Sequence, residues 1–238
     1  METMEKIIPT SHSLNPTVTG TSALAVTYDG GVAIATDRVA SYGKTARYKH
    51  IPRQYRVNEN VVVAFGGDHA DFQWLQNVIE RVEEDHKSYD SNIKLTARGL
   101  YNYLCSLLYY RRSKMDPLWN TLIVAGMNPE PTYDELAPFI GVITQRGVAY
   151  EAKSVATGMG QMLLNESLER ATRDKGGKLN KEEALDLIRT TVQLGYYHDC
   201  CADNEIDLTV VDKEGTHLLK PETFVGDWSL AEYNCQYE

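Results

Sequence analysis

Two apolar runs near the start of the chain flank a short turn. Residues Ser22–Tyr28 and Gly31–Thr36 are rich in Ala, Val and Ile, and an Asp-Gly step at Asp29-Gly30 separates them. Asp and Gly tolerate the positive φ angles of tight hairpin turns, so this step between apolar runs favours a hairpin. The pattern therefore predicts a strand, a turn and a second strand.

A second pair of strands and two amphipathic helices follow. Arg53–Val57 and Val61–Phe65 flank a polar turn, and Gly66–Asp68 is expected to turn the chain into a helix. Apolar residues recur in that helix at three- and four-residue spacing, which places them on one face. They are Phe72, Leu75, Val78, Ile79 and Val82. A second helix is expected over Leu95–Arg112, ending before Pro117.

The next part of the chain returns to strands. Leu118–Met127 is typical of a buried strand, and Phe139–Thr144 with Val148–Tyr150 predicts another hairpin around Gly147. Residues Asn128–Pro138 form a turn-rich insertion between them. This insertion is a candidate for contact with a partner.

Two helices and a last hairpin complete the pattern. The helices are expected at about Gly160–Thr172 and Glu182–Tyr197, with Asn180 as the N-cap of the second. Ile206–Val211 and His217–Leu219 predict the final pair of strands.

The order of these elements predicts the fold. A four-layer α/β/β/α sandwich of the α+β class requires this order of elements: strands, two helices, strands, two helices and strands. Three parts are expected along the chain: residues 1–20 as an N-terminal extension, 21–220 as one folded domain, and 221–238 as a tail.

Composition narrows the function classes. A formal net charge of -9 argues against general affinity for nucleic acid or an anionic membrane. The apolar runs are too short for a membrane span and the first residues lack the core of a secretory signal, which indicates a soluble intracellular protein. The cysteines lack metal-motif spacing and are expected to be reduced thiols, so neither a metal nor another cofactor is expected. They are Cys105, Cys200, Cys201 and Cys235.

Four segments, taken in order, resemble a known family. They are TGTSALAVTYDGGVAIATDRVASYG, VAFGGDHADFQWL, SVATGMGQ and YYHDCCADNEIDL. Together they resemble the successive landmarks of proteasome beta subunits, which have the N-terminal-nucleophile hydrolase fold. The stretches VTGTSALAV, RRSKMDPLWNT and GVAYEAKSVATG are most similar to the type-4 branch of the eukaryotic family, which fills the seventh ring position and is non-catalytic.

The resemblance implies where a catalytic site would lie. In active members, cleavage of the propeptide exposes a threonine whose hydroxyl attacks the peptide carbonyl, while its free α-amine serves as the base. Thr21, after Gly20, occupies that position, and Asp37 and Asp199 match the two family acids. Thr21 and Asp37 also have ordinary explanations, as a β-forming residue and a partner for backbone donors at a strand end.

Three other positions depart from the active pattern. Arg53 stands where active members have a lysine, Met159 where they have the serine of a Gly-Ser-Gly turn, and Ala202 where they have another serine. A guanidinium does not release its proton, a thioether cannot donate a hydrogen bond, and alanine has no polar side chain. We therefore interpret the site as degenerate, with Arg53 pairing with Asp37. The alternative is an active threonine endopeptidase subunit that uses Thr21.

A non-catalytic member of this family functions in assembly. The resemblance implies a place in the 20S core of ATP- and ubiquitin-dependent degradation in cytoplasm and nucleus. It also implies partners among beta subunits of the same and opposite rings, alpha-ring subunits and assembly chaperones. Aromatic and apolar residues of the tail are the expected contact residues, and residues 10–14 the expected propeptide cleavage region. The tail residues are Phe224, Trp228, Leu230 and Tyr233.

Overall fold

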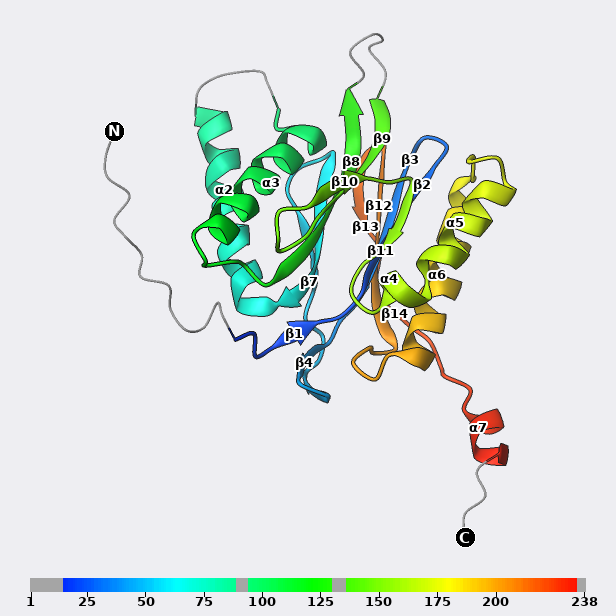
Figure 1. The fold of residues 1–238 in the computed structure, drawn as a ribbon. Helices are drawn as coiled ribbons and strands as arrows, with labels where there is room; N and C mark the ends of the chain where they lie inside the picture. Colours follow the sequence, from blue (N-terminus) through cyan, green and yellow to red (C-terminus); the bar gives the residue numbers. More distant parts are fainter. Residues whose placement is uncertain (1–14, 89–93, 130–135, 235–238) are drawn as a thin grey trace.

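Two antiparallel β-sheets lie face to face, and helices cover both outer faces (Figure 1). The computed structural model describes residues 15–88, 94–129 and 136–234, without the side chains of 230, 232 and 234. The elements are β1 (Thr19–Gly20), β2 (Ala23–Tyr28), β3 (Gly31–Asp37), β4 (Ala40–Tyr42), β5 (Thr45–Tyr48), β6 (Gln54–Arg56), β7 (Val61–Asp68), α2 (His69–Ser88), α3 (Ala97–Ser113), β8 (Asn120–Pro129), β9 (Leu136–Ile143), β10 (Ala149–Glu151), β11 (Ser154–Ala156), α4 (Gly160–Leu163), α5 (Asn165–Asp174), α6 (Lys181–His198), β12 (Glu205–Asp212), β13 (Gly215–Leu218), β14 (Glu222–Thr223) and α7 (Ser229–Asn234).

Each sheet joins strands that are far apart in the sequence. In the described part of the chain, one sheet has the order β10-β9-β8-β7-β1-β4-β5, with β6 paired to β7. The other has the order β11-β2-β3-β12-β13, with β14 paired to β12. The short strand β1 belongs to the first sheet and β2 to the second, so the chain between Gly20 and Ala23 crosses from one sheet to the other.

Three apolar layers separate the four layers of secondary structure. One layer fills the space between α2, α3 and the larger sheet, and includes Phe72, Leu104 and Val63. A second, with Ile34 and Ile123, lies between the two sheets. The third lies between the smaller sheet and the helices α5 and α6. The predicted four-layer α/β/β/α sandwich of the α+β class is confirmed. Among the described residues, no helix combines the length and the apolar character needed to cross a membrane.

The predicted hairpins form, but Gly66–Asp68 continues β7 and does not form a turn. Both glycines are required by close packing of backbone on backbone. A Cβ atom at Gly66 would lie 2.6 Å from the carbonyl oxygen of Thr21, and one at Gly67 would lie 1.9 Å from that of Trp119. Asp68 then caps α2, because its Oδ2 accepts hydrogen bonds from the amides of Ala70 and Asp71, each at 3.1 Å.

The insertion expected over residues 128–138 is shorter than predicted, because its first two residues continue β8 and its last three begin β9, and the two strands pair there. Two further elements also differ from the sequence prediction. The helix expected over residues 160–172 is divided at Leu164 into α4 and α5. At this point the side chain of Asn165 accepts a hydrogen bond from the amide of Ala156 in β11, at 2.6 Å. The hairpin of β4 and β5 was not predicted, because every residue of β5 is exposed and the strand carries no apolar alternation.

The tail begins inside the folded domain. Glu222 and Thr223 pair with β12, and Phe224 packs against Tyr196 of α6 with ring centroids 5.2 Å apart. Trp228 also contacts this helix, at 5.9 Å from the ring of Tyr196 and 5.0 Å from that of its neighbour Tyr197. The first residues of the tail are therefore attached to the domain, whereas the sequence pattern suggested a free end.

Asn180 starts α6 with a reciprocal capping box. Its Oδ1 accepts from the amide of Glu183 at 2.8 Å, and the Glu183 carboxylate accepts from the amide of Asn180 at 3.1 Å. We expect Asn180→Ala to lower the free energy of unfolding by about 0.5–2 kcal/mol, measured by urea denaturation. Asn180→Asp is the control and keeps the cap. Equal stability of the two variants would contradict this role.

Candidate functional site

The residues before Thr21 are held in the larger sheet. Thr19 of β1 pairs with Asp68 of β7 on one side and with Ser41 of β4 on the other. The carbonyl oxygen of Val18 accepts from the amide of His69 at 2.8 Å. In this chain the nitrogen of Thr21 is therefore an amide at the end of a paired strand.

Arg53 lies beneath Thr21 and is fully buried. Its Nη1 donates to the carbonyl oxygens of Thr21 at 3.0 Å and Phe65 at 2.9 Å. Its Nη2 donates to the carbonyl oxygen of Ser22 at 2.7 Å and to Oδ1 of Asp37 at 2.6 Å. Its Nε donates to both Oδ1 and the carbonyl oxygen of Asp37, at 3.0 and 3.2 Å. All five N–H groups of the guanidinium thus have acceptors.

The expected pair of Arg53 and Asp37 is confirmed as a buried ion pair, with side chains 1% and 4% exposed. Burial raises the pKa of the Asp37 carboxyl, and the Arg53 guanidinium opposes this shift by stabilising the carboxylate. The amide of Asp203 also donates to Oδ2 of Asp37, at 3.3 Å. Because the guanidinium keeps its proton, this pair supplies fixed charge and no proton transfer.

Asp199 binds the hydroxyl of Thr21 directly. It is the C-cap residue of α6, and its Oδ2 accepts a hydrogen bond from Oγ1 of Thr21. Its Oδ1 accepts from the amide of Cys201 at 2.9 Å. The fold thus brings together Thr21, Asp37 and Asp199, which lie far apart in the sequence.

The other two candidate positions add no hydrogen-bonding side chain beside Thr21. Ala202 lines a small cavity together with Thr21, Asp37 and Asp199, and contributes no hydrogen-bonding side chain. Met159 lies just before α4, is 43% exposed and does not line this cavity. The cavity volume is about 20 Å³, which is space for roughly one water molecule and not for a peptide.

Two residues at this site were missed in the sequence. Ser22 accepts from the amide of Gly160 at 2.8 Å and so ties the start of β2 to α4. Asp203 binds Asp37 through its amide. A main-chain donor carries no residue-type signal, and a serine beside a candidate nucleophile has no distinctive spacing, so neither contact could be found from the pattern.

In the described part of the chain there are two groups of three side chains whose possible metal-ligating atoms lie within 4.8 Å of one another. One consists of Asp199, Cys200 and Cys201, and the other of Asp212, Glu214 and His217. Burial raises the pKa of the Cys201 thiol to about 11, and the charges of Cys200 and Asp199 add to the rise. Without a cation, this thiol is therefore a poor replacement nucleophile.

The predicted contact residues of the tail differ in exposure. Phe224 is half-buried against α6, and the described ring of Trp228 is 45% exposed. Tyr233 in α7 is 87% exposed. The side chain of Leu230 lies outside the described part of the structure. Phe224 thus belongs mainly to the domain itself, while Trp228 and Tyr233 present apolar surface.

Comparison with known proteins gives one consistent result. The family model described as "Proteasome subunit" matches residues 17–211. The chain is 38% identical over 231 residues to "Proteasome subunit beta type-4" of Xenopus laevis, covering 97% of this chain and 92% of that protein. It is 34% identical over 230 residues to "Probable proteasome subunit beta type-7" of Schizosaccharomyces pombe, covering 96% and 86%. The Drosophila melanogaster "Proteasome subunit beta type-4" is 34% identical, with 94% and 81% covered.

The five donors of Arg53 allow a specific test. Lysine keeps the charge but has only three donors, so Arg53→Lys leaves buried acceptors unsatisfied. We expect a loss of about 1–3 kcal/mol in the free energy of unfolding, measured by urea denaturation. Arg56→Lys, on the exposed end of β6, is the matched control and should leave stability nearly unchanged. Equal stability of the two variants would show that the acceptors of Arg53 are dispensable.

Proposed function

The chain belongs to the proteasome subunit family, as a beta subunit of the 20S core, and we propose that it is a structural subunit that does not itself hydrolyse peptides. The observation that carries this proposal is the state of Arg53. The resemblance places a lysine there in active members, where it can lose and regain a proton. Here a guanidinium is fully buried and bound to acceptors through every N–H group.

The surroundings of Thr21 support the same proposal. The strand before it is paired on both sides, which supports retention of the Gly20–Thr21 bond, and while that bond is intact Thr21 has no free α-amine to act as base. The adjacent cavity of about 20 Å³ holds no peptide substrate. Ala202 and Met159 supply no hydrogen-bond donor from their side chains.

A second candidate function is threonine endopeptidase activity through Thr21. The observation in its favour is the hydrogen bond from the Thr21 hydroxyl to Asp199, which orients the oxygen and offers an acceptor for its proton. A carboxylate is, however, a weaker base than an α-amine. Cleavage after Gly20 would also be needed to supply the stronger α-amine base.

The domain organisation and the partners follow from the proposed structural function. Residues 1–20 act as propeptide and N-terminal extension, 21–220 as the beta-type domain, and 221–238 as an interaction tail. The subunit contacts beta subunits of its own and the opposite ring and subunits of the alpha ring, and assembly chaperones assist its incorporation. It acts in ATP- and ubiquitin-dependent degradation in cytoplasm and nucleus. Catalysis then lies in neighbouring subunits of the complex.

The first test concerns the mature N-terminus. We expect the subunit in assembled particles to begin upstream of Thr21, after cleavage by another protease at residues 10–14, which lie outside the described residues. Thr21→Ala should leave the cleavage unchanged, because a cut made by another protease does not need this hydroxyl. N-terminal sequencing of the particle subunit measures both outcomes. A mature chain that starts at Thr21 and depends on its hydroxyl would support the alternative endopeptidase.

The second test concerns the tail. Deleting residues 225–238 should leave the domain folded, because β14 and the packing of Phe224 on α6 are retained. The deletion should slow the joining of half-particles, since each apolar anchor that a partner buries contributes roughly 1.5–3 kcal/mol before the cost of ordering. Trp228→Ala should give a milder defect.

If half-particles join more slowly, they accumulate, and native gels and sedimentation measure the amount. Added salt should change the defect little, because the proposed contacts are mostly apolar. Phe224→Ala is a useful contrast, since it removes packing within the domain and should lower thermal stability of the subunit itself. Normal yield and rate of full particles with the truncated chain would remove the tail from ring association.

A further inference from the structure

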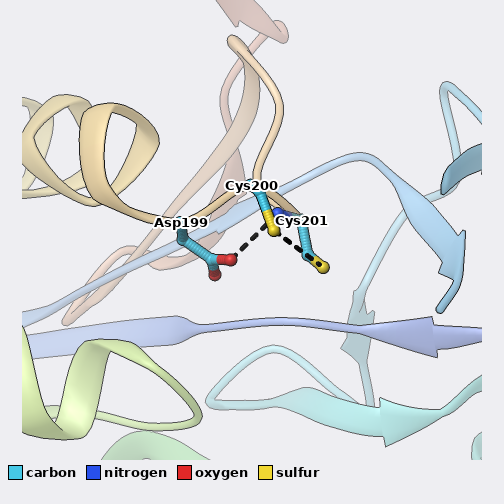
Figure 2. Close-up of side chains that lie close together, drawn as sticks. All are labelled: Asp199, Cys200 and Cys201. Atoms are coloured by element: carbon cyan, nitrogen blue, oxygen red, sulfur yellow. Dashed lines mark hydrogen bonds between the residues drawn. The ribbon is translucent and has the colours of Figure 1, made fainter. Parts of the chain in front are cut away.

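Two adjacent cysteines and a buried carboxylate meet where α6 ends (Figure 2). Asp199 is the C-cap residue, and the chain turns there so that the amide of Cys201 donates to Oδ1 of Asp199 at 2.9 Å. This turn folds the carboxylate back toward the two sulfur atoms. One carboxylate oxygen and both sulfurs lie within 4.8 Å of one another. Cys200 is exposed, which leaves the cluster open to solvent.

The spacing of the sulfurs suits one bound cation. The Sγ atoms of Cys200 and Cys201 are 3.9 Å apart. In a tetrahedral zinc site with Zn–S bonds of roughly 2.3 Å, two sulfur ligands are separated by about 3.8 Å. A disulfide would require a separation of about 2.05 Å. Without a cation, the two thiols are within reach of one weak hydrogen bond, and Sγ of Cys201 also donates to the carbonyl oxygen of Gly43 at 3.5 Å. Their separation already equals that of two ligands of one tetrahedral ion.

The carboxylate of Asp199 provides an independent observation. Asp199 is only 7% exposed, and a buried carboxylate is normally paired with a cation. Within the described residues, its hydrogen bonds come from the Thr21 hydroxyl and the Cys201 amide, and it takes part in none of the ion pairs. Asp37, in contrast, has Arg53. A cation held by the thiols would give Asp199 the missing positive partner.

We propose that Asp199, Cys200 and Cys201 bind one Zn²⁺ ion, with the fourth position open to water. Thiolate ligands favour zinc over magnesium or calcium, which prefer oxygen ligands. Each thiol releases its proton to solvent when it binds, and the cation stabilises the resulting thiolate. The sequence spacing predicted no zinc site, because zinc motifs usually separate two cysteines by two or more residues. Here the third ligand comes from the turn that ends α6.

This site touches the candidate nucleophile and yet does not depend on its reactivity. The same carboxylate that would bind zinc accepts the hydrogen bond of Thr21. Zinc would therefore fix Asp199 and, through it, the hydroxyl of Thr21. The proposal stands whether or not Thr21 is catalytic, because it requires only the three ligands and access from solvent.

The test uses the full chain, purified in reductant and then freed of metal and reductant. Zn²⁺ is titrated in competition with a chromophoric chelator, and Co²⁺ serves as a spectroscopic substitute. We expect one ion per chain and a thiolate-to-cobalt charge-transfer band. Cys200→Ser, Cys201→Ser and Asp199→Asn should each weaken zinc binding by at least about tenfold, since loss of an outer-shell partner alone costs about 10–100-fold. Cys105→Ser, on α3, is the matched control and should bind as the unaltered chain does.

A second readout on the unaltered chain guards against misfolded variants. Zn²⁺ should protect Cys200 and Cys201 from alkylation, mapped by mass spectrometry, while leaving Cys105 as reactive as before. The proposal is overturned if Zn²⁺ gives no selective protection or if the cobalt complex lacks the thiolate band. It is also overturned if a double variant with Cys200→Ser and Cys201→Ser binds zinc as tightly as the unaltered chain.

Discussion

The buried guanidinium of Arg53 is the interaction on which this end of the sandwich depends. It binds the carboxylate at the end of β3, the two carbonyl oxygens just before β2, and a carbonyl oxygen of β7. These acceptors belong to both sheets, so one side chain fixes how the two sheets meet. A charge buried in this way is tolerated because each of its donors has an acceptor and its carboxylate partner is close.

The same constraint explains the glycine before Thr21. A Cβ atom at position 20 would lie 2.4 Å from Cδ of Arg53, so only glycine lets β1 pass over the guanidinium. The Gly-Thr step therefore has a packing explanation that is independent of peptide cleavage. The proposed structural function therefore agrees with the resemblance to active subunits at position 53. An arginine in place of lysine retains the positive charge and the connection of the strands, and gives up the proton transfer.

The two helical layers differ in what they contact. The layer of α2 and α3 packs against the larger sheet with a continuous apolar core. At the end of α6, three features lie within a few residues. The last turn of the helix contacts the tail, the C-cap residue Asp199 accepts a hydrogen bond from Thr21, and the next two residues are the cysteines of the proposed zinc site. A change at this helix end would therefore reach both the candidate site and the tail. The physical link is short: Tyr196 lines the small cavity and also packs against Phe224 and Trp228.

The sequence by itself determined the order of strands and helices, and through it the layers. Apolar periodicity and turn residues are local signals, because they depend on a few neighbouring positions and not on how distant segments pack. It indicated the hairpin of β2 and β3, the apolar faces of α2 and α3 and the cap at Asn180. The resemblance also placed Thr21, Asp37, Asp199 and Arg53 in one site. Only the tertiary structure decided the rest. Pairing of β1, the extension of β7 through Gly67 and the attachment of Phe224 depend on backbone contacts between distant segments, which leave no periodic signal in the chain. The complete set of acceptors around Arg53 likewise exists only once both sheets have packed. The small cavity beside Thr21 exists only once α4 and α6 lie against the smaller sheet.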